Sequence, residues 1–95
     1  MNKEKLYNLA IATYGDEEQI NQGIEEMAEL IQAINKFRRN PCEETLNGIE
    51  EEIADVEIML EQYKLIYKIS DEEMSKHKSQ KLKRLAKRLE IYKLK

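Results

Sequence analysis

Apolar residues recur every three or four positions along nearly the whole chain, and very few residues interrupt the pattern. Ile20, Ile24, Met27, Ile31 and Ile34 follow one another at these steps, which would place them on one face of an α-helix. The sequence contains three glycines and one proline, which leaves little room for the turns of an all-β fold. The spacing therefore predicts an all-α chain.

Local signals divide this pattern into helices. The first predicted helix carries Leu6 and the apolar residues that follow it, and it closes near Gly15. The second begins at Asp16, the predicted N-cap, with two glutamates in a favourable first turn. It should end at Asn40–Pro41, because the residue before a proline disfavours the helical conformation.

Two further helices are predicted after the proline. One begins between Cys42 and Asn47, and Gly48 leaves its first residue open. Its apolar stripe consists of Ile49, Ile53, Val56, Leu60, Tyr63 and Tyr67. Ser70–Glu73 has the form of a capping box, so the last helix should start there and run through Leu82, Leu85 and Leu89. Four helices with short connections favour an antiparallel four-helix bundle, built from one domain over residues 1–95.

Size and composition limit the classes of protein to consider. A chain of 95 residues has a limited core, so a homodimer or homotetramer is expected to complete the bundle. No apolar run approaches the ~20 residues that span a bilayer, and the first residues lack the apolar stretch of a secretory signal. Cys42 is the only cysteine and cannot form an internal disulfide, which favours a cytoplasmic setting. A net charge of -3 argues against general nucleic-acid binding.

Two acidic clusters are the candidate functional feature. Glu25-Glu26-Met27-Ala28-Glu29 and Glu51-Glu52-Ile53-Ala54-Asp55 each set carboxylates three and four residues apart, on neighbouring turns of one helix side. Two such helices packed face to face would bring four carboxylates into one small volume. Because unpaired anions repel one another there, a hard divalent cation is the expected partner, and Mg²⁺ binds through carboxylates together with substrate phosphate oxygens.

Positions on the helical wheel strengthen this interpretation. Glu52 falls inside the apolar stripe of the third helix, Asp55 lies at the edge of that stripe, and Glu26 sits on the shoulder of the second stripe, with Glu29 one step further out. Buried carboxylates are costly unless they are paired or bound to metal. The competing interpretation is that these residues are solvated, as most glutamates on helices are.

The same residues resemble a known family. Glu26-x-x-Glu29, about twenty residues, and then Glu52-x-x-Asp55 is similar to the signature of the MazG-like nucleoside triphosphate pyrophosphohydrolases, which belong with the all-α NTP pyrophosphohydrolases and the dimeric dUTPases. The resemblance covers roughly residues 15–89. It implies that the four carboxylates bind Mg²⁺, with Mn²⁺ as an alternative, and that a nucleoside triphosphate is cleaved to the monophosphate and pyrophosphate. Glu25 is then a candidate general base. The alternative is that Glu25 is a plain surface residue.

Basic residues crowd the last helix and offer a second candidate element. The resemblance favours Lys78, Lys81 and Arg84 as contacts to the triphosphate, while a solvated basic face is the competing interpretation. Nucleic-acid binding through this face is the weaker possibility, because a basic helix without interleaved aromatics is a weak signal. Gln19, about two turns before the first cluster, is a candidate contact to the base.

These observations lead to one main expectation and one rival. The main expectation is a Mg²⁺-dependent NTP pyrophosphohydrolase that works as a homo-oligomer, with Tyr63, Ile66, Tyr67 and Ile69 in the subunit interface. The rival is a catalytically silent helical module that binds a partner protein through its acidic surface.

Overall fold

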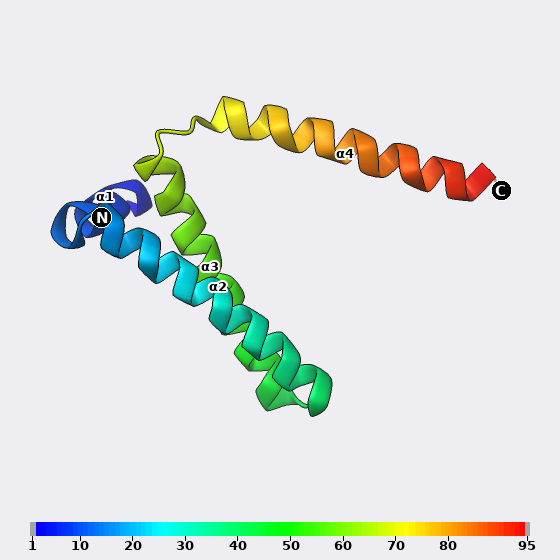
Figure 1. The fold of residues 1–95 in the computed structure, drawn as a ribbon, viewed down its shortest axis with the longest axis horizontal. Helices are drawn as coiled ribbons and strands as arrows, with labels where there is room; N and C mark the ends of the chain where they lie inside the picture. Colours follow the sequence, from blue (N-terminus) through cyan, green and yellow to red (C-terminus); the bar gives the residue numbers. More distant parts are fainter. Residues whose placement is uncertain (1, 95) are drawn as a thin grey trace.

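The chain forms four helices, as the apolar spacing predicts. The computed structural model describes the backbone of residues 2–94 and the side chains of residues 2–90, and within this range it contains no strand. The helices are α1 (Lys3–Tyr14), α2 (Asp16–Arg39), α3 (Glu43–Ile66) and α4 (Asp71–Leu94), shown in Figure 1. The all-α prediction is therefore confirmed. None of these helices is long and apolar enough to cross a membrane.

Gly15 separates the first two helices and corrects one predicted boundary. The N-cap of α2 is Gly15, whose φ is 91° and ψ 155°, a conformation that a residue with a Cβ rarely adopts. Its N–H also caps α1 by donating to the carbonyl of Ile11 over 2.8 Å. One residue thus serves both helix ends, and Asp16 becomes the first residue of α2 instead of its cap. The acidic first turn still suits the positive end of the helix dipole.

The starts of α3 and α4 are set by side-chain caps. Thr45 Oγ1 accepts a hydrogen bond from the Cys42 N–H at 3.2 Å and donates to the Asn40 carbonyl at 2.8 Å, so α3 begins at Glu43 and Gly48 lies inside it. Ser70 Oγ accepts from the Glu73 N–H at 3.1 Å, which is the serine half of the predicted capping box, and α4 begins at the next residue, Asp71.

Only three of the four helices pack together within the chain. α2 and α3 form an antiparallel hairpin, and α1 packs against both helices at one end of it. α4 makes no contact with the other three helices among residues 2–94 and extends away from the hairpin (Figure 1). The radius of gyration is accordingly 17.2 Å, whereas a compact domain of this length has about 12 Å. One chain therefore does not complete a four-helix bundle.

The direction of α4 follows from the turn that ends α3. The Ile69 N–H donates to the Lys64 carbonyl at 2.9 Å and the Lys68 N–H donates to the Leu65 carbonyl at 3.3 Å, which is the Schellman pattern of a helix C-terminus. Lys68 occupies its left-handed position with a φ of 55°, where glycine is usual. This turn ends α3 and leaves a short link before α4.

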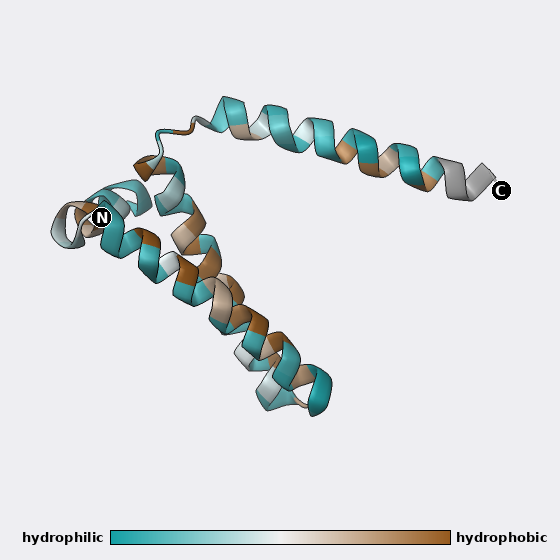
Figure 2. Ribbon diagram, viewed as in Figure 1, coloured by the Kyte–Doolittle hydropathy of each residue, from teal (hydrophilic) through white to brown (hydrophobic). Residues whose placement is uncertain are grey.

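The core is thin, and apolar side chains remain on the surface. Among residues 2–90, Met59 is the only apolar side chain that is buried. Several large apolar side chains are more than half exposed, including Ile31 at 61% and Leu82 at 63%. Figure 2 shows hydrophobic residues along the hairpin and in a series along α4. The chain alone therefore does not cover its predicted apolar faces.

Candidate metal centre

The hairpin is aligned by polar contacts at its α1 end. Gln19 on α2 and Gln62 on α3 are buried, and Gln19 Nε2 donates to Gln62 Oε1 over 2.6 Å. At the next residue of each helix, the Tyr63 hydroxyl donates to the Ile20 carbonyl at 2.6 Å. Gly23 lies under this ring, so close that an added Cβ would come within 2.5 Å of Tyr63 Cζ. These contacts fix which residue of α2 faces which residue of α3.

The same register opposes the two acidic clusters. In an antiparallel pair, a step forward along one helix is matched by an equal step back along the other. Seven residues after Gln19 comes Glu26, and seven residues before Gln62 comes Asp55. Three residues further on, Glu29 is opposed by Glu52. The glutamine pair therefore brings the two predicted motifs into alignment.

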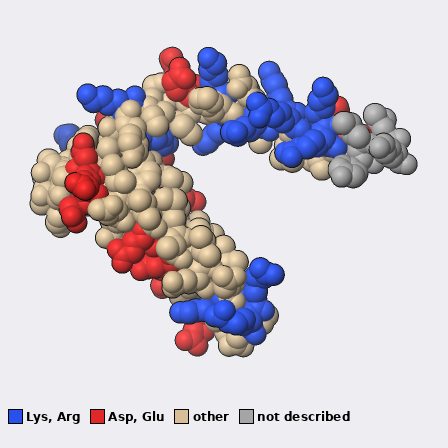
Figure 3. All heavy atoms as spheres, viewed as in Figure 1, with Lys and Arg blue, Asp and Glu red and all other residues tan. Residues whose placement is uncertain are grey.

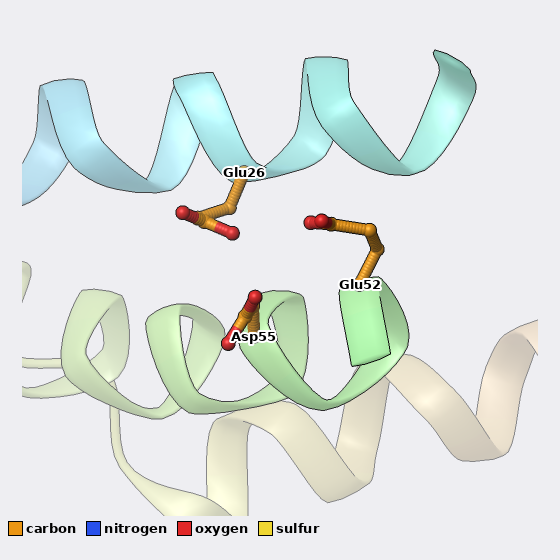
Figure 4. Close-up of side chains that lie close together, drawn as sticks. All are labelled: Glu26, Glu52 and Asp55. Atoms are coloured by element: carbon orange, nitrogen blue, oxygen red, sulfur yellow. The ribbon is translucent and has the colours of Figure 1, made fainter. Parts of the chain in front are cut away.

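Three of the four predicted metal ligands converge. Glu26 from α2 and Glu52 and Asp55 from α3 each offer a carboxylate oxygen, and these oxygens all lie within 4.8 Å of one another. Figure 4 shows the three side chains pointing into the space between the two helices. Glu29 lies outside this trio but close to it. The negative charges of Glu52 and Asp55 are near enough to contribute to the raised pKa of Glu29.

The environment of Glu26 disfavours its charged form. The pKa of Glu26 is raised from 4.5 to about 7, mainly by burial and in smaller part by the nearby carboxylates of Asp55 and Glu29. A hydrogen bond of 2.8 Å from Gln22 Nε2 to Glu26 Oε1 acts in the opposite direction. The pKa of Glu29 is also raised, first by partial burial and then by the charge of Glu52. Closely spaced carboxylates share this behaviour, because each charge opposes the ionisation of the next.

Two oxygens of the cluster lack a protein partner. Glu26 Oε2 and Glu52 Oε2 are shielded from solvent and receive no hydrogen bond from the residues that the structure describes. The nearest basic residue along α3, Lys64, instead pairs with Glu61 at 3.0 Å. A buried carboxylate oxygen without a donor is costly, and a cation is one partner that would satisfy it. The donor set consists of carboxylates alone, which suits the hard cations Mg²⁺ and Mn²⁺.

The remaining predicted site residues lie elsewhere. Glu25 is exposed on α2 beside Glu26, and its charge contributes to the raised pKa of Glu29. Gln19 is buried and its Nε2 donates to Gln62, so little of its amide is open to a substrate base. Lys78, Lys81 and Arg84 are exposed on α4, which makes no contact with α2 or α3. Within one chain, the structure does not bring these bases to the acidic cluster.

Sequence reasoning missed the parts that align the site. Gln62 and Gly23 belong to no recognisable motif, and the apolar stripe predicts a subunit contact for Tyr63. A usable signal exists in hindsight, because each glutamine stands seven residues from an acidic motif, before the first and after the second. Equal spacing on two antiparallel helices predicts that the glutamines meet when the carboxylates do.

Comparisons with other proteins add no assignment. The chain matches no protein-family model, and searches of curated proteins and of solved structures gave no match.

Proposed function

We propose that this protein is a Mg²⁺-dependent nucleoside triphosphate pyrophosphohydrolase that releases a nucleoside monophosphate and pyrophosphate. The observation that carries the proposal is the convergence of Glu26, Glu52 and Asp55 from two helices, with two buried oxygens that receive no hydrogen bond from the described residues. The resemblance of the two motifs to the MazG-like family supplies the reaction. A carboxylate-only site that takes up Mg²⁺ together with substrate phosphates supports it chemically.

The residues of the acidic cluster would have two roles, metal binding and proton transfer. Glu26, Glu29, Glu52 and Asp55 would hold the metal, with Mn²⁺ as an alternative ion. A bound divalent ion neutralises phosphate charge and lowers the pKa of a bound water. Glu25, exposed beside the cluster, is the proposed base that takes the proton from the attacking water. The electron pair of the broken α–β phosphoanhydride bond leaves with pyrophosphate.

Self-association forms the second part of the proposal. The thin core and the exposed apolar residues support a homodimer or homotetramer, in which a second copy would cover part of the hairpin. Tyr67 and Ile69 are exposed and remain available for the predicted interface, whereas Tyr63 is engaged within the chain. A triphosphate contact from Lys78, Lys81 or Arg84 would likewise have to come from a second copy, because their own helix stands apart.

A panel of ribo- and deoxyribonucleoside triphosphates with Mg²⁺ tests the proposal. We expect pyrophosphate and not orthophosphate as the product. Glu52→Gln keeps the side-chain shape but weakens coordination, so we expect a loss of activity of roughly a hundredfold or more, the range seen when one group that stabilises transition-state charge is removed. Glu44→Gln, which changes an exposed residue in the first turn of α3, is the matched control. Unchanged turnover in Glu52→Gln would remove Glu52 from the site.

The rival function is a helical module that binds a partner protein without catalysis. The observation that favours it is the apolar surface left uncovered on the hairpin and on α4. It predicts no pyrophosphate release from any nucleotide in the panel and no stabilisation by Mg²⁺. The panel therefore separates the two functions.

A further inference from the structure

An uncovered apolar row runs along α3. Leu46, Ile53, Leu60 and Tyr67 are spaced seven residues apart and are between 42% and 56% exposed. Their neighbours three residues on, including Ile49 and Val56, are only partly exposed. The predicted apolar stripe of this helix is thus wider than α2 covers. We call these four residues the α3 row.

A matching row on α2 lies on the same side of the hairpin. Ile24 and Ile31 are 56% and 61% exposed. At about 100° per residue, Ile24 and Ile31 lie roughly 120° clockwise from the side of α2 that faces α3, when α2 is viewed from its N-terminus. The α3 row is turned in the same sense from the side of α3 that faces α2. Because the two helices run antiparallel, rotations in the same sense lead to one side of the pair. The two rows therefore form one continuous apolar face.

α4 carries an apolar row of its own with nothing against it. Leu82, Leu85 and Leu89 follow at steps of three and four residues and are 63%, 45% and 52% exposed. This spacing is that of helices that pack along a heptad seam. α4 has no contact with the other helices of its chain. The leucine row, defined by these three residues, thus lacks a partner within the described residues.

Charges beside the rows are complementary. Glu50 and Glu57 stand four residues after Leu46 and Ile53, on the flank of the α3 row away from α2, and both are exposed. Lys81 and Arg88 directly precede Leu82 and Leu89 and flank the leucine row; both are exposed. Glu50 and Glu57 are seven residues apart, and so are Lys81 and Arg88. Figure 3 shows the basic side chains gathered on α4.

The charge balance of the two surfaces agrees with this pairing. Residues 16–66 carry fourteen acidic and four basic side chains, whereas residues 71–94 carry eight basic and four acidic ones. Opposite potentials favour association between the hairpin and α4 and disfavour hairpin against hairpin.

We propose that the leucine row of α4 docks on the apolar face of the α2–α3 hairpin of a second copy of this chain. The Schellman turn at Lys68 leads α4 away from its own hairpin, whereas a reciprocal exchange covers both rows in both chains and closes as a two-fold dimer. Lys81 and Arg88 of one chain then pair with Glu57 and Glu50 of the other. The inference rests on the self-association in the proposed function, and it names the surfaces without requiring catalysis.

Charge reversal on the full-length chain tests the exchange. One variant carries Lys81→Glu and Arg88→Glu, and a second carries Glu50→Lys and Glu57→Lys. The wild-type chain, of 11.3 kDa, should sediment as a dimer at micromolar concentration. Each variant alone sets like charges against each other and should sediment as a monomer. An equimolar mixture should recover the dimer, because both contacts in the mixed dimer are then complementary.

Controls separate docking from folding and from catalysis. Lys83→Glu with Lys87→Glu makes the same charge change on the side of α4 away from the leucine row and should leave the dimer intact. A chain with all four reversals should dimerise by itself, which checks that the reversed surfaces still fold. A wild-type monomer, or a mixture that stays monomeric, would overturn the exchange. Absence of pyrophosphate release from an intact dimer would instead overturn the proposed function alone.

Discussion

Gln19 donates a 2.6 Å hydrogen bond to Gln62 across the hairpin, in line with the opposed carboxylates seven residues away. Both amides are buried, at 8% and 5% exposure. A buried polar pair of this kind opposes sliding of the helices, because any shift would leave both amides unpaired. A contact two turns from the acidic cluster therefore sets the geometry of the cluster.

Replacing one of the two glutamines should lower the free energy of unfolding more than replacing both. In Gln19→Leu the Gln62 amide stays buried without its partner, and we expect a destabilisation of about 1–3 kcal/mol. Gln19→Leu with Gln62→Leu replaces the pair by an apolar contact and should recover part of that loss. Urea unfolding of the two single variants and the double variant measures the coupling. Strictly additive losses would show that the hydrogen bond carries no coupling energy.

Two glycines inside helices should respond to alanine in opposite ways. An added Cβ at Gly23 would overlap the Tyr63 ring, which its hydroxyl holds against Ile20, so Gly23→Ala should destabilise the chain by about 1–3 kcal/mol. Gly48 has nothing within 4 Å of an added Cβ, so Gly48→Ala should stabilise α3 by about 0.5–1 kcal/mol. Thermal unfolding of both variants checks the signs. Tyr63→Leu should lessen the penalty of Gly23→Ala; an unchanged penalty would show that the ring is not its cause.

Stability should fall as pH rises through the window set by Glu26. Its pKa is 4.5 ordinarily and about 7 in the fold, so between these values the folded chain binds more protons than the unfolded chain. Folding stability therefore decreases from pH 4.5 to 7, and the contribution is fully present only below that window. Urea unfolding at pH 5 and pH 8 measures the difference, and Glu26→Gln should reduce it. An equal pH dependence in the variant would place the titration on other groups.

Mg²⁺ should reverse this trend. Metal binding requires deprotonated carboxylates, so Mg²⁺ should raise the melting temperature more at pH 8 than at pH 6, where Glu26 holds its proton. Glu44→Gln should respond as the wild type does, because Glu44 is exposed in the first turn of α3. A melting temperature independent of Mg²⁺ at both pH values would argue against the metal site.

Sequence periodicity predicts the helices better than their assembly. The helix ends follow from local chemistry, since Pro41 and Ser70 act on their immediate neighbours. Gly15 shows where such local prediction fails. The sequence predicts Asp16 as the N-cap of α2, but Gly15 can adopt a φ of 91° and occupies that position instead. The place of α4 has no such local signal. Its leucine row predicts an apolar contact but not whether the partner helix lies in the same chain.

The carboxylates of the acidic cluster were predictable from the sequence, but their alignment was not. Glu26, Glu52 and Asp55 are recognisable because carboxylates on apolar stripes are unusual. Their meeting depends on the register of two helices, which apolar stripes alone specify loosely. The side chains that fix the register, Gln62 and Tyr63 over Gly23, act through contacts between residues about forty positions apart in the sequence. The equal spacing of Gln19 and Gln62 from the two acidic motifs becomes informative only once the two helices are known to pair antiparallel, and the contact of Tyr63 with Gly23 has no such sequence signal.

The basic helix offers a test that separates substrate binding from docking. Arg84 is exposed on α4 and is turned away from the leucine row by about a third of a turn at ~100° per residue, whereas Lys81 borders that row. If Arg84 holds the triphosphate, a charge-assisted contact of about 1.5–3 kcal/mol is lost in Arg84→Ala. KM should then rise, or turnover fall, by roughly tenfold or more. Melting should change little, because an exposed charge contributes about 0–1 kcal/mol to stability.

Lys83→Ala is the matched control for Arg84→Ala, since Lys83 is the neighbouring residue on the same helix and is also exposed. Steady-state kinetics and sedimentation on both variants, together with Lys81→Ala, give each residue two readouts. A phosphate contact at Arg84 predicts impaired kinetics with an intact dimer. A docking role at Lys81 predicts weaker association, with kinetics that recover at high protein concentration. Normal kinetics in all three variants would contradict triphosphate binding by α4. The acidic cluster would then be the only proposed phosphate-binding element left, and its metal would have to act without help from the basic helix.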